Sequence, residues 1–228
     1  MLDCVGNPAK NGLVPAMPRK PGPQITRAEV VQAAAAVLAR DGYDHLTMRA
    51  VAAEIGVRAP SLYWHVKSKE DLSLLLFDHL IDNLDYGAVT GDWRADMRRM
   101  ADRLRDRLVG TRDITRLFPE DYASGPRAIR SLEMGLGLMR QAGLPPVEAL
   151  DAYATALSFI VGWARFEVTR RANAEIVQTA PAPDLGALPN LAWAVAASGL
   201  QPDYDRGFEY GVGLFIAGLE QRLTALRN

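Results

Sequence analysis

The chain has 228 residues, about half of them hydrophobic, and a formal net charge of −1. This length suits one large domain or a small module joined to a larger one, and the apolar share excludes a wholly disordered chain. The single cysteine, Cys4, excludes an internal disulfide. The longest uncharged stretch, residues 185–202, is too polar for a membrane span, and no signal-peptide pattern opens the chain. We therefore expect a cytoplasmic protein without membrane contact.

Residues 1–24 are rich in proline and glycine and lack any periodic apolar pattern. This composition predicts a flexible tail. The tail carries Arg19 and Lys20, and a basic arm of this kind can enter a DNA minor groove beside a DNA-binding module. A plain disordered linker explains the same residues equally well.

The first predicted helix begins after Thr26. Thr26 and Glu29 have the spacing of a capping box, in which each side chain binds the other residue's backbone amide. Apolar residues recur at helical spacing behind it, at Val30, Ala34, Val37 and Leu38. The helix is expected to end near Asp41-Gly42, because glycine readily adopts the left-handed conformation that closes helices.

Two short helices are predicted next, from Thr47 to Gly56 and from Pro60 to Val66, joined by Gly56-Val57-Arg58. Thr47 can cap the first, and proline suits the first turn of the second because that amide needs no partner. Ser68 can cap a further, longer helix. Two short helices joined in this way are the outline of a helix-turn-helix, whose second helix lies in a DNA major groove.

The second of these helices has an unusual side-chain pattern. Leu62 and Val66 stand four residues apart and are expected to face inward, which leaves Tyr63 and Trp64 on the outer side. Hydroxyl, indole and ammonium groups suit phosphate oxygens. Residues 18–69 hold eight cations and four acids, a net charge of +4 that favours a polyanionic partner. The competing interpretation is that the Tyr-Trp pair belongs to the core.

Beyond residue 90 every periodic segment has a helical period and none alternates like a strand. Helices are expected at 92–108, 126–142, 147–171, 188–198 and 203–226, separated by glycine- and proline-rich breaks. The predicted fold is all-α, with an N-terminal three-helix helix-turn-helix module followed by a larger helical bundle.

The segment from Ile25 to His79 resembles the DNA-binding domain of the TetR family of transcriptional repressors. The stretch "LTMRAVAAEIGVRAPSLYWHVKSKEDL" is especially similar to the tetracycline-repressor-like subgroup, in which "LYWHVK" is a hallmark. With the capping Thr47 and the linker Arg58 added, the resemblance implies an operator-facing set consisting of Thr47, Met48, Arg49, Arg58, Ala59, Pro60, Ser61, Tyr63, Trp64, His65, Lys67 and Lys69.

One position departs from that subgroup. Ala59 stands where the subgroup has a glutamine, and its methyl side chain cannot donate a hydrogen bond to a base. Arg58, one residue earlier, can take over base contact. We therefore expect a different operator sequence.

The resemblance also implies that the remainder binds a small molecule and forms a homodimer. The implied domains are a tail at 1–24, a DNA-binding domain at 25–69 and a ligand-binding and dimerisation domain at 70–228. Small residues four apart on helices 147–171 and 203–226 allow close helix approach and are the candidate dimer interface; with the large residues between them they are Ala154, Leu157, Ser158, Val161, Gly162, Gly207, Phe208, Gly211, Phe215, Gly218 and Leu219. Packing of these faces within one chain is the alternative.

The candidate effector pocket is assembled from methionine, aromatic and leucine side chains, which make adaptable walls for a bulky apolar ligand. These are Met97, Met100, Leu104, Leu117, Phe118, Met134, Leu138, Tyr153, Phe159, Trp163, Phe166 and Trp193. Phe118 and Asp85 stand where the tetracycline repressors have histidines, so tetracycline–magnesium recognition is not expected. The three histidines lack metal-site spacing, and we expect no metal and no cofactor.

The sequence thus predicts a sequence-specific transcriptional repressor that binds double-stranded DNA and is released from its operator by a small, largely apolar effector. An effector-independent or activating DNA-binding regulator is the first alternative. A small-molecule enzyme with an all-α cavity is the second, but the sequence contains no nucleophile–base pair, metal set or phosphate loop to support catalysis, so no enzymatic activity is expected.

Overall fold

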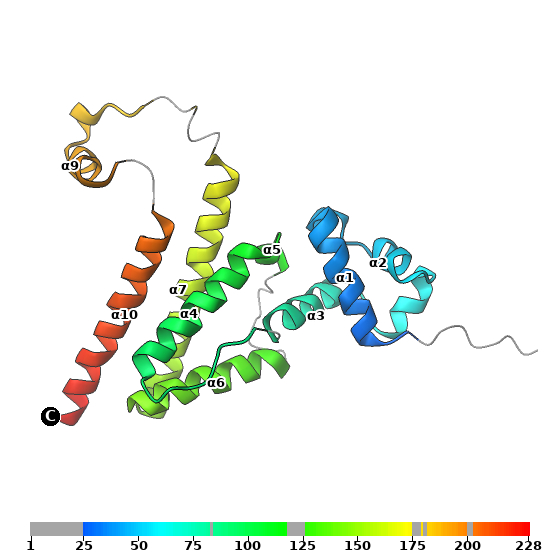
Figure 1. The fold of residues 1–228 in the computed structure, drawn as a ribbon, viewed down its shortest axis with the longest axis horizontal. Helices are drawn as coiled ribbons and strands as arrows, with labels where there is room; N and C mark the ends of the chain where they lie inside the picture. Colours follow the sequence, from blue (N-terminus) through cyan, green and yellow to red (C-terminus); the bar gives the residue numbers. More distant parts are fainter. Residues whose placement is uncertain (1–24, 83, 118–125, 175–178, 180–181, 200–202) are drawn as a thin grey trace, which may run out of the picture.

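The computed structural model describes residues 25–82, 84–117, 126–174, 179, 182–199 and 203–228, and these are helical without any strand. The predicted all-α fold class is confirmed. The elements follow in chain order (Figure 1): α1 (Arg27–Asp41), η1 (Tyr43–His45), α2 (Met48–Ile55), η2 (Ala59–Trp64), α3 (Lys69–Asp82), α4 (Trp93–Gly110), α5 (Ile114–Leu117), α6 (Pro126–Ala142), α7 (Pro146–Ala172), η4 (Leu185–Ala187), α9 (Pro189–Ser198) and α10 (Tyr204–Arg227).

The predicted capping signals of the first helices are present. Thr26 Oγ1 accepts from the Glu29 amide at 3.2 Å while the Thr26 amide donates to Glu29 Oε2 at 2.7 Å. Thr47 Oγ1 accepts from the Ala50 amide at 3.1 Å. The α2 helix ends at Ile55 and is capped by Gly56, whose φ of +81° lies in the left-handed region that favours glycine. Local sequence therefore determines where α1 and α2 begin and where α2 stops.

The second helix of the helix-turn-helix is shorter and tighter than expected. It is a 3₁₀ helix that ends at Trp64, where we predicted a helix reaching Val66. The backbone hydrogen bonds at its two ends each span three residues, as in a 3₁₀ helix. Ser61 N donates to Arg58 O at 2.9 Å, and His65 N donates to Leu62 O at 2.8 Å. Leu62 and Val66 are fully buried, so their inward orientation is confirmed. Short 3₁₀ segments are common because their poorer hydrogen-bond geometry does not sustain long runs.

One core holds the N-terminal module together, and α3 leads out of it. Buried side chains from α1, α2, η2, α3 and the turn before α2 meet there; they include Val30, Val37, Leu38, Leu46, Val51, Leu62, Leu72 and Leu76. The α3 helix packs against α1 at one end and against α5 and α6 further along. Figure 1 shows α3 running from the module toward the larger bundle. The expected boundary between residues 69 and 70 falls within the first turn of α3 and stays a prediction.

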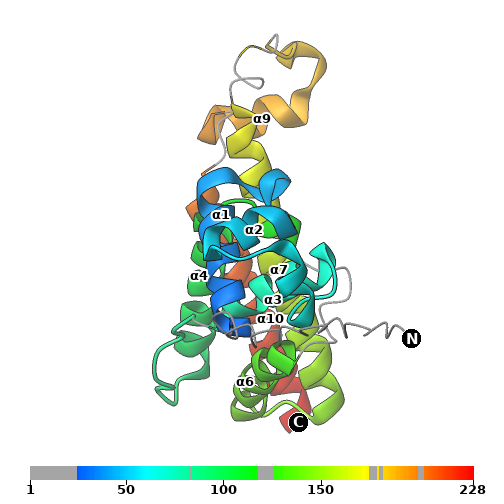
Figure 2. The same ribbon diagram turned by 90° about the vertical axis from the view of Figure 1, so that its right-hand side faces the viewer.

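The larger bundle is built on α4, α6, α7 and α10. The α4 helix packs against α6, α7 and α10, and α10 packs against both α4 and α7. The α9 helix lies apart from these, at the end of α7 and α10 farthest from α6, as both ribbon views show (Figures 1 and 2). Among the described residues, no helix combines the length and the apolar character needed to cross a membrane.

Candidate nucleic-acid interface and effector cavity

The outer side of η2 exposes the aromatic pair that sequence reasoning singled out. Trp64 is 91% exposed and Tyr63 is 55% exposed, whereas their neighbour Leu62 is fully buried. Burial of a large aromatic side chain is worth several kilocalories per mole, so two adjacent rings left in water indicate a surface that meets a partner. The competing core interpretation of this pair is therefore wrong.

The rest of the candidate DNA-binding set lies around this helix. Thr47, Arg49, Arg58, Pro60 and Lys67 are exposed. The half-buried members are Met48, Ala59, Ser61, His65 and Lys69, of which Met48 and Ala59 pack against the module core. Within the part of the chain described by the structure, the side chains of Arg49, Arg58 and Lys67 have no ion pair. Three exposed cations of this set are thus left without an ion pair among the described residues.

Lys69 behaves differently from those three cations. Its ammonium group donates to the Tyr43 carbonyl oxygen at 3.3 Å and lies 4.2 Å from the centre of the Tyr43 ring. Arg116 of α5 lies over the same ring at 4.6 Å. A cation over an aromatic face is attracted by the ring quadrupole. Lys69 is therefore engaged inside the protein, at a place where the module meets the bundle.

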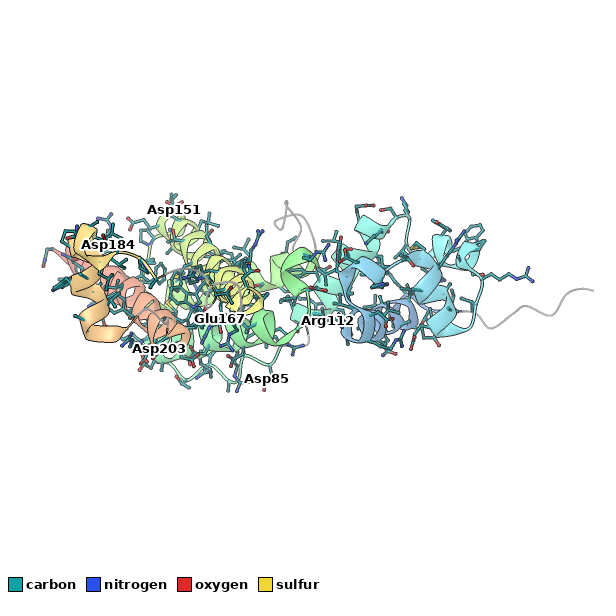
Figure 3. All side chains as sticks on the ribbon, turned by 90° about the horizontal axis from the view of Figure 1, so that it is seen from above. Asp85, Arg112, Asp151, Glu167, Asp184 and Asp203 are labelled. Atoms are coloured by element: carbon teal, nitrogen blue, oxygen red, sulfur yellow. The ribbon has the colours of Figure 1, made fainter. Side chains whose placement is uncertain are left out.

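That meeting place is a polar junction. On one side lie α5 and the turn before it, and on the other lie the last turn of α1 and the turn after it. Asp113 Oδ2 accepts from the Tyr43 amide at 2.9 Å, and Arg112 donates to the Arg40 carbonyl at 2.8 Å. Arg116 and Asp44 form a two-bond ion pair at 2.8 and 3.0 Å, and the hydrogen bond from Arg116 lowers the pKa of Asp44. Figure 3 shows Arg112 where the bundle and the module adjoin. We call this set, with Lys69, the domain junction.

An apolar cavity of about 60 Å³ lies inside the bundle, between α4, α6, α7 and α10. Met97, Met100 and Leu104 of α4 form one side of it, and Tyr153 and Phe159 of α7 form another. Its polar feature is a hydrogen bond from the Tyr153 hydroxyl to Ser131 Oγ at 3.3 Å. Burial raises the pKa of Tyr153, so this hydroxyl is a neutral donor at physiological pH.

The structure brings half of the predicted pocket residues to this cavity: Met97, Met100, Leu104, Leu138, Tyr153 and Phe159. Met134 lies at a neighbouring cleft, and Leu117 is buried in α5. Trp163 and Phe166 continue an aromatic row beyond Phe159, with ring centres 5.9 Å apart at each step. Trp193 is 81% exposed on α9, and Phe118 lies outside the described residues.

The sequence analysis did not predict the small residues that line the cavity, nor the lining residues that it had assigned to the dimer interface. A search for large side chains passes over Ala101, Gly135 and Ala156, although small residues are what leave space in a core. At Gly135 a Cβ atom would stand 2.3 Å from the Tyr153 ring, so glycine is required for that ring to pack there. The other lining residues not foreseen are Tyr86, Ser131, Met139, Ile160 and Val212.

The predicted dimer residues divide into two groups. Gly207 and Gly211 accommodate Trp163 and Phe159 of the same chain, since an added Cβ would stand 2.6 and 2.3 Å from those rings. Phe208 is 1% exposed, and Leu157 and Phe215 line the cavity. These five residues pack within one chain, which was the alternative interpretation of the sequence pattern. Ala154, Ser158, Gly162 and Gly218 are exposed, and Val161 and Leu219 are half-buried.

An ion network centred on the buried Arg105 and Glu167 joins α4, α7 and α10. Arg105 of α4 binds Glu167 of α7 at 2.8 Å and Asp205 of α10 at 2.7 Å, and Glu167 also binds Arg171. Glu167 is nearly inaccessible to solvent, and Figure 3 shows it between the helices. Breaking one partner of a buried pair leaves an uncompensated charge, so this network holds α4 in register with α7 and α10.

These features define a class of protein: a DNA-binding regulator with a helix-turn-helix module and a helical bundle that encloses an apolar ligand cavity. Comparison with known proteins agrees. The profile described as bacterial regulatory proteins, tetR family, matches residues 30–75, and the tetracyclin repressor-like C-terminal domain profile matches residues 88–223. The chain belongs to the TetR family, and it is a ligand-responsive, DNA-binding transcriptional repressor.

Relatives and solved structures share this architecture. The chain is 31% identical to an HTH-type transcriptional regulator of Saccharopolyspora erythraea, over 87% of this chain and 88% of that protein. It is 30% identical to the HTH-type transcriptional repressor DrrR1 of Streptomyces coeruleorubidus, over 92% and 83%. The crystal structure of the Streptomyces coelicolor TetR family protein ActR in complex with (S)-DNPA superposes with a TM-score of 0.76 at 27% identity, over 87% of this chain and 98% of that one.

Proposed function

We propose that η2 enters the major groove of an operator and that a largely apolar effector, bound in the bundle cavity, releases the protein from that DNA. This proposal depends on the exposed Trp64 and Tyr63, and on Arg49, Arg58 and Lys67, which form no ion pair within the described residues. The protein acts in the cytoplasm, and its role is regulatory rather than catalytic. ActR, solved with (S)-DNPA and with actinorhodin, supports an effector that is an organic small molecule.

In this proposal the exposed residues divide the work of DNA binding. Tyr63, Trp64 and Lys67 contact phosphates and fix the register, while Arg49 and Arg58 read bases. Arginine suits guanine because its two N–H groups match the O6 and N7 acceptors in the major groove. Thr47, Met48, Ala59, Pro60, Ser61 and His65 complete the surface as small or half-buried neighbours. Lys69 supports this surface from the domain junction instead of contacting phosphate.

The α4 helix connects effector to operator in this proposal. Its middle forms one wall of the cavity through Met97, Met100 and Leu104, and the residues after its last turn bind the module through Arg112 and Asp113. An effector that widens the cavity displaces α4 and therefore the junction. Ligand and DNA then oppose each other to the extent that they favour different positions of α4.

We further propose that the exposed positions on α7 and α10, Ala154, Ser158, Gly162 and Gly218, pack against the same surface of a second copy. A two-fold dimer presents two η2 helices to successive major grooves, so operator half-sites are expected about one helical turn apart. In this proposal residues 25–69 form the DNA-binding domain and residues 70–228 form the ligand-binding and dimerisation domain. The tail at 1–24 lies outside the described residues.

Fluorescence anisotropy with DNA fragments from both sides of the protein's own gene tests the proposed function. We expect binding to one fragment that survives competition by unrelated DNA at moderate salt. Absence of any such binding contradicts the proposal. A thermal-shift screen of varied small molecules separates the effector-dependent repressor from an effector-independent regulator, because a ligand that fills the cavity raises the melting temperature.

A further inference from the structure

Two hydroxyl groups meet at the wall of the bundle cavity and are joined by one hydrogen bond. The Tyr153 hydroxyl of α7 lies 3.3 Å from Ser131 Oγ of α6, and both side chains line the cavity. Within the part of the chain that the structure describes, neither hydroxyl forms another hydrogen bond. Two hydroxyls carry two hydrogens and their mutual bond uses one, so one O–H donor is left over whichever group donates.

The tyrosine of this pair is held in place by α6. Its ring lies against Gly135, one turn after Ser131, where a Cβ atom would stand 2.3 Å from the ring. A larger residue at position 135 would push the ring away. The pair therefore has a fixed position on the cavity wall, with the Tyr153 ring packed on one turn of α6 and its oxygen bonded to the turn before.

The cavity has the chemistry of a site for an uncharged ligand. Its lining consists of apolar side chains together with Tyr86, Ser131 and Tyr153, and the described lining residues include no acid, base or histidine. Burial raises the pKa of Tyr153, so the pair stays neutral at physiological pH. A charged ligand group would lose its hydration there without gaining a counter-charge.

Space for a ligand depends on methionine side chains. The cavity measures about 60 Å³, whereas an engineered cavity that binds benzene measures about 150 Å³, so a ring that enters must displace part of the wall. Met97 and Met100 of α4 and Met139 of α6 are lining residues. Methionine has three rotatable bonds and adapts to irregular shapes. A ligand thus meets a fixed hydroxyl pair and an adaptable thioether wall.

We propose that the effector is an uncharged aromatic compound with a carbonyl oxygen, and that this oxygen accepts a hydrogen bond from the Ser131–Tyr153 pair. The aromatic part lies among the methionine, leucine and phenylalanine side chains of the cavity. A carbonyl suits the site because the pair has one donor to spare, and an acceptor buried without a donor costs free energy. This assignment rests on the proposed function in calling the ligand an effector, and it adds the ligand's charge and the group that is recognised.

Such a ligand acts on α4. Its oxygen is fixed at the hydroxyl pair of α6 and α7, so its ring is accommodated by movement of Met97 and Met100. These two residues belong to the helix that leads to the domain junction through Arg112 and Asp113. Recognition of the carbonyl and the response to the ring therefore fall on different helices.

Two bicyclic probes that differ at one carbon test the inference. 1-Indanone has a carbonyl where indane has a methylene, and ligand-observed NMR titration of the full chain is expected to show binding of both. The double variant Ser131→Ala/Tyr153→Phe removes both hydroxyls. It should weaken 1-indanone by about three- to tenfold, the size of one neutral hydrogen bond, and leave indane unchanged. Each single variant keeps one hydroxyl and should lie between the wild-type chain and the double variant.

A matched control removes the same two groups elsewhere. Ser73 is a buried residue of α3 whose hydroxyl has no partner among the described residues, and Tyr210 is an exposed residue of α10. Neither lines the cavity. Ser73→Ala/Tyr210→Phe should therefore change the affinity of neither probe.

A further variant identifies where the probes bind. Ala156→Leu fills the cavity from α7 and should weaken both probes at least about tenfold. Thermal unfolding without probe checks that each variant is folded, and Ala101→Leu fills the same cavity from α4 if Ala156→Leu does not fold.

Four results would overturn the inference. These are failure of 1-indanone to bind the wild-type chain up to its solubility, unchanged 1-indanone affinity in the double variant, an equal loss of both probes there, and binding that survives filling of the cavity. Operator binding by the same samples without probe reports separately on the proposed function, so either can fail while the other holds.

Discussion

At the scale of single residues, the position of a side chain on η2 decides whether it is buried in the core or exposed to a partner. Leu62 and Trp64 are two residues apart, yet one is fully buried and the other is 91% exposed. Apolar spacing predicted the buried pair Leu62 and Val66 correctly because a short helix against a core has only one inward side. Lys67 and Lys69 look equivalent in the sequence, but only Lys69 is drawn into the domain junction, by a tyrosine that lies 26 residues earlier.

Replacement of Arg58 by alanine should weaken operator binding by about 1–3 kcal/mol and relax the preference at one base pair of each half-site, if that side chain reads guanine. Anisotropy with the natural operator and with singly substituted operators measures both effects. Lys67→Ala is the comparison: loss of a phosphate contact should weaken all sequences alike and reduce the salt slope by about one. A uniform loss in the Arg58 variant would assign that residue to the phosphate backbone.

The glycines of α10 give a stability prediction. Gly211→Ala should destabilise the protein by about 1–3 kcal/mol, because its Cβ would stand 2.3 Å from the Phe159 ring and the ring must shift. Gly213→Ala, on the same helix with nothing within 4 Å, should be neutral or stabilising by up to about 1 kcal/mol. Urea unfolding of both variants measures the difference. Equal stability of the two variants would show that α7 does not pack on Gly211.

At the scale of elements, α4 and α5 link two parts of the chain that are far apart in sequence. Asp113 adopts a φ of +53°, unusual for a residue other than glycine, and its carboxylate binds the amide of Tyr43, 70 residues earlier. Strained conformations of this kind persist only where surrounding contacts hold them. The helix predicted at 92–108 corresponds closely to α4. The sequence pattern did not indicate, however, that the turn between α4 and α5 would bind the turn after α1.

Asp113→Ala should therefore loosen the domain junction while leaving both parts folded. The Tyr43 amide loses its acceptor, so its hydrogen exchange should become faster, and calorimetric unfolding should broaden as the module and the bundle uncouple. Asp106→Ala, an exposed acid of α4 with no hydrogen bond or ion pair in the described residues, is the matched control. Unchanged exchange at Tyr43 would mean that Asp113 does not support the junction in solution.

At the scale of the whole molecule, the proposed function requires a second copy of the chain. One η2 helix covers only one half-site, and the proposed dimer, with two copies joined through α7 and α10, would place two helices on one face of the duplex. The exposed small residues of α7 permit close helix approach, as the sequence pattern indicated. Gly207 and Gly211 of α10 belong to the same sequence pattern, but they accommodate Trp163 and Phe159 of the same chain. The sequence could not distinguish them from residues of a dimer interface, because it does not show which side of α10 faces α7.

Ala154→Arg places a long charged side chain on the proposed dimer surface and should produce monomers that bind the operator at least about tenfold more weakly, because both half-sites no longer bind as one unit. Gln141→Arg, at an exposed position of α6, adds the same charge elsewhere and should remain dimeric. Sedimentation velocity reports the oligomeric state directly. A dimeric Ala154→Arg protein would place the interface on another surface.

The sequence by itself determined the helical class, the starts of α1 and α2, the helix-turn-helix and the outward Tyr63 and Trp64, because capping and apolar spacing act over only a few residues. Only the tertiary structure decided which large side chains surround empty space, which glycines receive rings, and which cation joins the domain junction. Those outcomes depend on contacts between helices distant in sequence, such as Phe159 with Gly211 and Lys69 with Tyr43, and residue type alone does not specify them.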